Sequence, residues 1–250
     1  VYAGDGTLNE AANALIGTTV ALAPLPGGST NVFARTLGLP DNATEATRIV
    51  LDSLAAESIR HIGTGSVNGR HFLFHCGVGW DATLVRQTEK RARFKRFLGH
   101  GLFVWCGLET WFHLYDRTRP HFAVHHEDGR TIPNGCFTVV QNTNPYTFVG
   151  HHPFNVAPDL TLVDPLAVTT LTELRSKPFL GLMWDTLRSP ESLVTHAIVD
   201  HVAKTNGLTI TADEPVPHQA DGDDLGDATL LEFHHHPDSL RVVIPERYPW

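Results

Sequence analysis

The first residues of the chain combine glycine with side chains that could bind phosphate or move a proton. They read Gly4-Asp5-Gly6-Thr7, and Glu10 follows within a predicted helix. Glycines let a main chain approach a phosphate closely, and the free amides of a following helix point towards the same place. Thr7 adds a hydroxyl donor, and Asp5 could hold Mg²⁺ or orient a nucleophile. An ordinary Asp-Gly turn that caps a helix has the same composition, so this segment alone does not decide between the two.

A second glycine-rich turn precedes a predicted helix within the segment from Pro26 to Arg35. Its candidate phosphate ligands are Gly28, Ser29, Thr30, Asn31 and Arg35. Arg35 lies one helical turn after Asn31 and could face the same anion. In an open parallel sheet, the loops after neighbouring strands line one crevice at the carboxyl ends of the strands. Two such loops at consecutive crossovers therefore predict a phosphate site.

A third segment, near the C-terminus, places three carboxylates around one glycine. It reads Asp221-Gly222-Asp223-Asp224. Carboxylates at this spacing could bind a metal ion or supply a general base. A solvated acidic hairpin turn has the same composition and is the alternative.

Two kinds of element must position these segments. The first 55 residues alternate short apolar runs with helical patterns, among them helices near 8–16, 31–37 and 42–55 and a strand at 19–23, which is typical of a parallel α/β sheet. Later residues alternate in a strand pattern, with hairpins predicted at Asn68-Gly69, Asp128-Gly129 and Asn206-Gly207. We predict a partial α/β nucleotide-binding domain over residues 1–58. A mostly antiparallel, β-sandwich-like domain with a helical insertion follows over 59–240, and a tail over 241–250 returns to the first domain.

Composition limits the classes of function. Of 250 residues, 42% are hydrophobic, which favours a globular chain, and the formal net charge of −8 disfavours a nucleic-acid partner. No apolar run reaches the length of a membrane span, and three separated cysteines fit a reduced, cytoplasmic setting. The basic run from Lys90 to Arg96 could dock on an anionic membrane or form a solvated helix face.

The three segments, in this order, resemble the diacylglycerol-kinase-like lipid kinase family, which includes the sphingosine and ceramide kinases. That family's pattern is Gly-Gly-Asp-Gly-Thr-x-x-Glu, then Pro-x-Gly-Thr-x-Asn-x-Phe-Ala-Arg-x-Leu-Gly, then Asp-Gly-Glu. It is matched at Ala3–Glu10, Pro26–Gly38 and Asp221–Asp223. The resemblance implies ATP and Mg²⁺ between two domains, and transfer of the γ-phosphoryl group to a lipid hydroxyl at a membrane surface.

The resemblance also implies roles for particular residues. The nucleotide-binding residues would be Gly4, Gly6, Thr7, Glu10, Gly28, Ser29, Thr30, Asn31 and Arg35. Asp221 would be the general base, with Asp5 as a rival for that role. Asp5 and Asp223 would serve the metal–phosphate site. Asp164 lies in a segment that resembles a structural Mg²⁺ site of the family.

This sequence departs from the family pattern at several positions. Ala3 replaces a glycine, Ser29 replaces a threonine and Asp223 replaces a glutamate. The segment of Asp164 has Val163 and Pro165 where the family has an aspartate and a glycine. Family members carry further βα units before the first motif, so we expect this chain to hold only the second half of a nucleotide domain and to bind ATP poorly alone.

Two alternatives to a lipid kinase remain open at this point. NAD kinases share the first motif, so an NAD kinase-like enzyme is one alternative. A catalytically inactive, lipid-binding relative is the other, and the altered residue at position 223 motivates it. The sequence does not identify the acceptor lipid or the oligomeric state.

Overall fold

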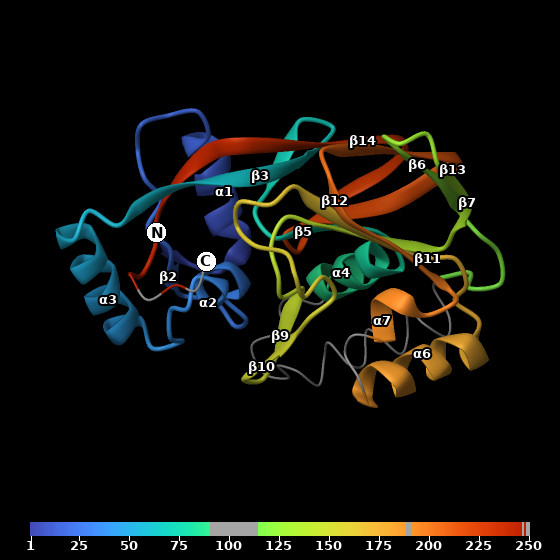
Figure 1. Cartoon of the computed structure of the whole chain (residues 1–250), viewed down its shortest axis with the longest axis horizontal. Helices are drawn as coiled ribbons and strands as arrows, with labels where there is room; N and C mark the ends of the chain where they lie inside the picture. Colours follow the sequence, from blue (N-terminus) through green and yellow to red (C-terminus); the bar gives the residue numbers. More distant parts are fainter. Residues whose placement is uncertain (91–114, 189–191, 247, 249–250) are drawn as a thin grey trace.

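The computed structural model describes residues 1–90, 115–188, 192–246 and 248. The chain forms an α/β part at its N-terminal end and a mostly antiparallel sheet beyond it (Figure 1). The predicted fold class is therefore confirmed. The predicted domain limits stay a prediction. Within the described ranges, no helix is both long and apolar enough to span a bilayer.

The α/β part contains β1 (Tyr2–Ala3), α1 (Asp5–Leu15), β2 (Leu25–Pro26), α2 (Val32–Thr36) and α3 (Ala43–Ala55). β1 and β2 pair in parallel, with Ala3 opposite Pro26. The predicted strand over residues 19–23 is wrong. Only Leu22 forms a bridge there, to Val242, and the strand that pairs with β1 comes later.

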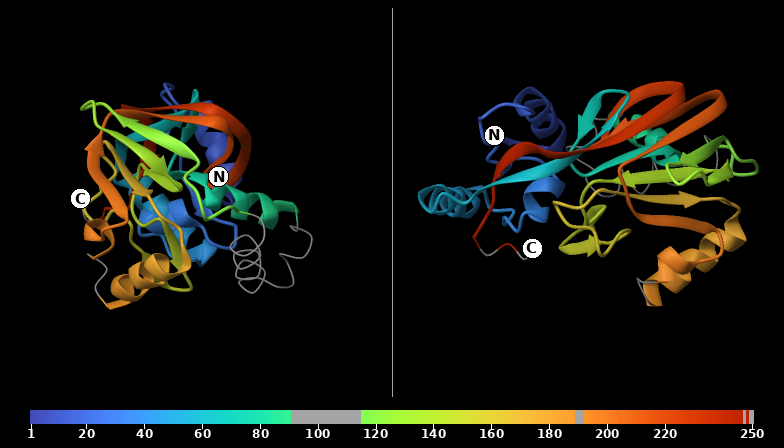
Figure 2. Two further views of the ribbon diagram at one scale, coloured as in Figure 1. Left: turned by 90° about the vertical axis from the view of Figure 1, so that its right-hand side faces the viewer. Right: turned by 45° about the horizontal axis from the view of Figure 1, so that its top comes forward.

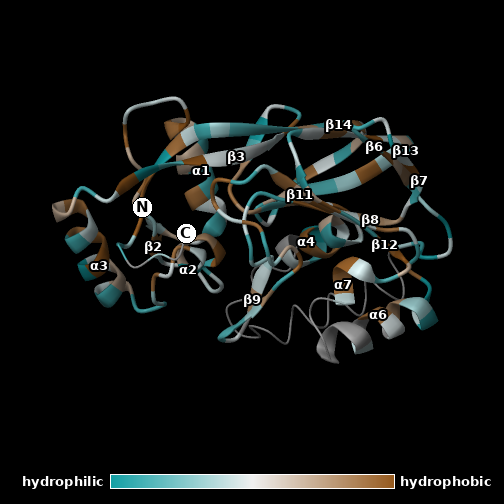
Figure 3. Cartoon of the chain, viewed as in Figure 1, coloured by the Kyte–Doolittle hydropathy of each residue, from teal (hydrophilic) through white to brown (hydrophobic). Residues whose placement is uncertain are grey.

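Helix α3 follows its sequence signals closely. The Asn42 side chain accepts a hydrogen bond from the Glu45 amide at 3.1 Å and so caps the N-terminus of the helix. Ala46 and Val50 are buried, whereas Leu51 and Leu54 are exposed. The helix accordingly carries hydrophobic and hydrophilic residues in alternating bands (Figure 3).

Ten strands form one sheet in the order β12-β11-β8-β5-β13-β14-β3-β4, with β6 and β7 attached beside β13. The strands are β3 (Ile59–Val67), β4 (Arg70–Phe72), β5 (His75–Gly79), β6 (Phe122–His126), β7 (Thr131–Gly135), β8 (Phe137–Gln141), β11 (Leu166–Leu171), β12 (Val199–Thr205), β13 (Gly207–Ala220) and β14 (Asp223–Val243). The hairpin β9 (Thr147–Val149) and β10 (His152–Phe154) and the helices α4 (Trp80–Lys90), α6 (Ser176–Arg188) and α7 (Ser192–Thr195) complete the described elements.

Two of the three predicted hairpins are confirmed. Asn68-Gly69 joins β3 to β4 and Asp128-Gly129 joins β6 to β7, each pair antiparallel. The hairpin at Asn206-Gly207 is wrong, because β12 pairs with β11 and β13 pairs with β5, β6 and β14. The Glu127 carboxylate accepts the Asn206 amide at 3.1 Å at this crossing, so a side chain rather than a hairpin ladder fixes the local chain direction.

Strands β3 and β14 run side by side from the sheet into the α/β part (Figure 2). Their far ends place Ile62, Leu240 and Val242 in one buried cluster with Leu8 and Phe33. Since β14 begins at the third motif and ends in the core of the α/β part, the long strand ties that motif to the first two.

Candidate active site

The first two motifs lie against each other because β1 and β2 pair in parallel. A Cβ atom added at Gly28 would lie 2.7 Å from Cα of Gly4, and one added at Gly27 would lie 2.7 Å from the Ala3 nitrogen. Such distances leave no room for a side chain. The glycines of the second motif therefore let two main-chain loops pack closely, in addition to any contact with phosphate.

Asp5, the first residue of α1, links the two motifs. Its carboxylate accepts hydrogen bonds from the amides of Val32 at 3.0 Å and Phe33 at 3.2 Å. These amides begin α2, where main-chain donors lack partners within the helix. Asp5 lines the cavity described below and also holds the second motif in place.

The second motif is closed by one of its own side chains. Asn31 has a left-handed main chain, with φ of 52°, and accepts the Gly28 amide at 2.7 Å while donating to the Gly28 carbonyl at 3.1 Å. Arg35 donates to the Gly150 carbonyl at 2.9 Å, and its guanidinium lies 3.8 Å from the centre of the Phe148 ring. Neither Asn31 nor Arg35 lines the cavity, so the structure does not bring them to the predicted anion.

The third motif forms the turn between β13 and β14, with φ of 49° at Asp221 and 88° at Gly222. The alternative of a solvated acidic turn does not fit Asp221, which is only 2% exposed. Asp223 reaches the first motif, because a Cβ atom at Gly6 would lie 2.7 Å from its Oδ1 atom. The structure thus brings the first and third motifs together, although 215 positions separate them in the chain.

Asp221 sits in a cradle of four hydrogen-bond donors. Its Oδ2 atom accepts from the Leu73 amide at 2.6 Å and from the Asn9 side chain at 2.7 Å. Its Oδ1 atom accepts from the amides of Phe74 at 2.9 Å and His75 at 3.1 Å. Burial raises the pKa of Asp221 to about 7, although all four donors act to lower it. A carboxyl group with this pKa can accept or release a proton near neutral pH.

A second buried carboxylate, Asp81, was not among the predicted site residues. Asp81, at the start of α4, accepts hydrogen bonds from the Tyr146 hydroxyl at 2.5 Å and from the Gln219 side chain at 2.6 Å. A Cβ atom at Gly77 would lie 2.0 Å from Asp81 Oδ2, so the glycine makes room for it. Burial and the Asp81 carboxylate raise the pKa of Tyr146 well above its ordinary value.

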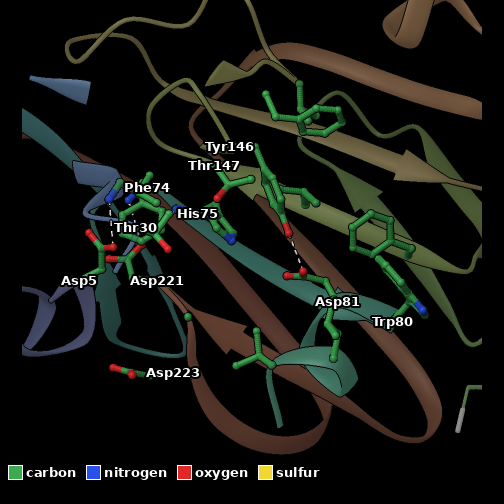
Figure 4. A pocket seen from close by; sticks show the side chains of 18 of the residues that line it. Asp5, Thr30, Phe74, His75, Trp80, Asp81, Tyr146, Thr147, Asp221 and Asp223 are labelled. Atoms are coloured by element: carbon green, nitrogen blue, oxygen red, sulfur yellow. Dashed lines mark hydrogen bonds between the residues drawn. The ribbon is translucent and has the colours of Figure 1, made fainter. Parts of the chain in front are cut away.

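His75 connects the two carboxylates. Its amide binds Asp221, and its ring stacks on the Tyr146 ring at 4.4 Å between centroids. Burial lowers the pKa of His75 to about 4, against an opposing effect of Asp81, so its ring is neutral at pH 7. Figure 4 shows His75 between Asp221 on one side and Asp81 with Tyr146 on the other.

One cavity of about 940 Å³ joins the motifs to an apolar interior. Its polar end is lined by Gly4, Asp5, Gly6, Thr7, Glu10, Gly28, Ser29, Thr30, Asp221 and Asp223. Its apolar end is lined by Leu84, Val85, Phe137, Val139, Phe154, Val156, Leu171, Leu174, Phe179, Leu182 and Leu193. The size and the division into two ends fit a ligand with a charged head and a long apolar body.

The polar end has the features of a phosphate site. Gly4 precedes α1 and supplies no capping side chain, so the first amides of this 11-residue helix have no side-chain cap. Thr7 and Ser29 are exposed and line the cavity nearby. These donors fit the phosphates of a nucleotide.

The carboxylates fit Mg²⁺ only as part of a metal–nucleotide complex. Among the described residues, no three His, Cys, Asp or Glu side chains are grouped so that they could hold a metal ion. Mg²⁺ is usually held by one or two carboxylates together with substrate phosphates and water. Asp5 and Asp223, the carboxylates predicted for the metal–phosphate site, both line the cavity, as does Glu10. Asp164 does not line it. Its carboxylate accepts from the Lys204 ammonium at 2.5 Å and from the Thr161 hydroxyl at 2.7 Å.

The basic run, for which a membrane-docking patch and a solvated helix face were the two alternatives, lies mostly outside the described residues, since residues 91–96 are not among them. The cysteines at 76 and 136 are buried and free. No signal in the sequence pointed to Tyr146, and Gln219 adjoined the third motif without an assigned role. For Asp81, the signal was its position directly after a buried strand and at the start of a helix.

Comparison with known proteins places these motifs. Residues 1–67 match the model of the diacylglycerol kinase catalytic domain. Over 146 residues, the chain is 35% identical to a protein of Chromohalobacter salexigens named Probable lipid kinase YegS-like, covering 53% of this chain and 44% of that one. It is 27% identical to the diacylglycerol kinase of Bacillus subtilis over 248 residues, covering 97% of this chain and 76% of that one.

A solved structure of a diacylglycerol kinase from Bacillus anthracis has the same fold, with a TM-score of 0.69 and 22% identity over 97% of this chain and 76% of that chain. The chain spans about half the length of the first curated relatives, 44% and 53%. Together the matches bear out the resemblance carried by the three motifs: the chain is similar to diacylglycerol kinases and related lipid kinases, and residues 1–67 match the catalytic-domain model.

Proposed function

We propose that this chain carries the active site of an ATP-dependent lipid kinase, which transfers the γ-phosphoryl group of ATP to the hydroxyl of a diacylglycerol-like or sphingoid lipid. The observation that carries the proposal is one cavity that joins the glycine-rich motifs at one end to an apolar lining at the other. Asp221 lines that cavity. A water-soluble acceptor such as NAD would not need the apolar end, which favours a lipid over an NAD kinase-like activity.

The residues divide the reaction between them. The loops at Gly4–Thr7 and Gly28–Thr30 bind and orient the phosphates through main-chain amides and hydroxyls. Asp221 takes the proton of the acceptor hydroxyl. The hydroxyl oxygen forms a bond to the γ-phosphorus while the bond between the γ-phosphorus and the β-phosphate oxygen breaks, which releases ADP. Mg²⁺, when bound, neutralises charge on the phosphates. The apolar lining excludes water and holds the lipid body, so that the hydroxyl lies near Asp221.

The test, made on the full-length protein, is transfer of label from [γ-³²P]ATP with Mg²⁺ to lipid in mixed micelles. The acceptors are dioleoylglycerol and sphingosine, with NAD in a parallel reaction. We expect labelled lipid, and loss of label with Asp221→Asn. The matched control is Asp213→Asn, which changes an exposed carboxylate on the same strand, β13. Labelled NAD without labelled lipid would favour the NAD kinase-like alternative. Lipid binding without any transfer would favour the inactive relative.

A further inference from the structure

Asn9 lies in α1, one turn after the glycines of the first motif, and is only 1% exposed. Its Nδ2 atom donates to Asp221 Oδ2 at 2.7 Å and to the His71 carbonyl at 3.0 Å. Its Oδ1 atom accepts from Arg70 at 2.7 Å and from the Asn13 side chain at 3.0 Å. Both N–H donors and both lone pairs of this buried amide are therefore in use.

The surroundings fix the orientation of the Asn9 amide. The groups that face Oδ1 are a guanidinium and an amide nitrogen, which only donate, whereas the groups that face Nδ2 are a carboxylate and a carbonyl, which only accept. A flipped amide would oppose donors to donors at one end and acceptors to acceptors at the other. Arg70 also pairs with Glu10, which holds the guanidinium against α1.

Asn9 differs from the other donors in the Asp221 cradle. Leu73, Phe74 and His75 donate through main-chain amides of the sheet, whereas Asn9 donates from a side chain of the α/β part. The four donors match the roughly four lone-pair sites of a carboxylate. An acceptor hydroxyl that approaches Asp221 must displace one of them, and only the Asn9 donor can turn away without a shift of the main chain.

We propose that Asn9, held by Arg70, is a positioning residue for Asp221. It orients the carboxylate across the junction of the two parts and gives up its hydrogen bond when the acceptor hydroxyl arrives. The inference rests on the proposed function, in which Asp221 takes the proton of that hydroxyl.

The chain offers a matched control for Asn9. Asn13 lies one turn later on α1, accepts the His71 amide at 3.1 Å and donates to the His71 carbonyl at 3.0 Å. It therefore joins the same two elements without touching Asp221. If Asn9 only holds α1 to β4, Asn9→Ala and Asn13→Ala will have similar effects on activity.

The kinetic test compares kcat and KM of these variants. We expect Asn9→Ala to lower kcat about tenfold to a hundredfold, the rate equivalent of one hydrogen bond to a charged group. The KM for the lipid acceptor should not rise, because the acceptor no longer displaces a donor. Asn13→Ala removes one of the two hydrogen bonds to Asn9 Oδ1 but leaves the Asn9 donor to Asp221 in place, so it should lower kcat less than Asn9→Ala does. Arg70→Leu should lower kcat less than Asn9→Ala does, and Arg70→Lys should restore part of the loss. Equal losses of kcat in Asn9→Ala and Asn13→Ala would overturn the inference.

A second test needs no enzymatic activity. In a double-mutant cycle on urea unfolding, Asn9→Ala and Asp221→Ala should be strongly non-additive, whereas Asn13→Ala and Asp221→Ala, which are linked only through Asn9, should couple less. Additive effects for the first pair would overturn the inference whether or not the chain phosphorylates lipid. Absence of transfer by the wild type, with the coupling present, would instead refute the proposed function and leave Asn9 assigned to the orientation of Asp221.

Discussion

Asp5 and Asp221 line the same cavity, and each carboxylate accepts main-chain amides from a neighbouring segment. Asp5 accepts the two amides that begin α2 and remains partly exposed. Asp221 accepts three amides and the Asn9 side chain, and is nearly inaccessible to solvent. Both carboxylates are thus held by main-chain amides, but Asp221 is more deeply buried than Asp5.

Depth separates what the two carboxylates can do. Burial raises the pKa of Asp221 to about 7 even though four hydrogen-bond donors act to lower it. Desolvation of a charged group outweighs several hydrogen bonds when no cation lies beside it. Asp221 therefore has the proton affinity of a general base at neutral pH, and the role that we assign to Asp5 is to hold the second motif against the first.

The largest expected effect comes from replacing each carboxylate with its amide. Asp221→Asn should lower the rate of transfer about a thousandfold through loss of the general base. It should also destabilise the fold by about 3 kcal/mol, because its NH₂ group would face main-chain donors in a buried site. Asp5→Asn should cost only about 1 kcal/mol, since water can reach the amides that it leaves. Urea unfolding and single-turnover transfer measure both effects, and equal losses of stability would contradict the comparison.

The second effect is a dependence of stability on pH, which comes from a buried histidine beside Asp221. The segment that holds Asp221 contains the buried ring of His75, whose pKa is about 4 when folded, against the ordinary value of 6.5. Between these values the unfolded chain binds a proton that the folded chain does not. Stability from His75 is thus full above about pH 6.5 and is lost as the pH falls towards 4, by about 3 kcal/mol in total.

His75→Phe should remove this loss, because the aromatic ring still packs on Tyr146 and no longer titrates. The measurement is the difference in unfolding free energy between wild type and variant from pH 7 to pH 4. A difference is needed because the raised pKa of Asp221 acts in the opposite direction and lowers stability as the pH rises over this range. His151→Phe, at an exposed histidine, is the control. Parallel curves for wild type and His75→Phe would refute the burial argument.

The third effect concerns stability, and it tests how strongly the two glycine-rich loops around Asp5 depend on the close packing of their main chains. Gly28→Ala should cost about 2 kcal/mol, because the new Cβ would meet Cα of Gly4 and neither loop can yield without moving Asp5 or α2. Gly6→Ala should cost less, since its Cβ would meet the movable Asp223 carboxylate. Thermal unfolding of both variants measures this order. A Gly6→Ala variant less stable than Gly28→Ala would show that Asp223 is held more firmly than we infer.

Much of the polar end of the cavity could be predicted from the sequence. Two glycine-rich turns one βα unit apart must adjoin when their strands pair in parallel, and the Asp-Gly pair at 221–222 does form a tight turn. The depth of Asp221 could not be predicted, because it depends on where the hairpin tip meets β4, β5 and α1. Arg35 has the spacing of a phosphate ligand but binds the β9–β10 hairpin, a contact 115 residues away.

The contact between Asp81 and Gln219 could not be predicted either, because it also joins residues that are far apart in the chain. Their contact spans 138 residues and follows from the register of β13 on β5, which sets Gln219 opposite Gly77. Local patterns predict turns, caps and helix faces, whereas this register is decided by packing across the whole sheet. The Asn206-Gly207 dipeptide has a hairpin composition, but the pairing of β12 and β13 with other strands prevents it.

The smallest expected effect concerns the side chain that closes the second motif. Asn31 has a positive φ, so Asn31→Ala should lose both hydrogen bonds to Gly28 and also strain the main chain. Asn31→Gly loses the same bonds without the strain and should be the more stable variant by about 1 kcal/mol, the reverse of the usual order of these residues.

Asn68, in the β3–β4 turn, also has a positive φ, of 47°, but does not line the cavity that joins the motifs to the apolar interior. The substitutions Asn68→Gly and Asn68→Ala are therefore the matched controls. Asn68→Gly should also be more stable than Asn68→Ala. Only the variants at position 31 should weaken nucleotide binding measured by calorimetry, because Asn31 shapes the loop beside Asp5. If both pairs weaken it equally, the closure of the second motif by Asn31 does not matter for the nucleotide.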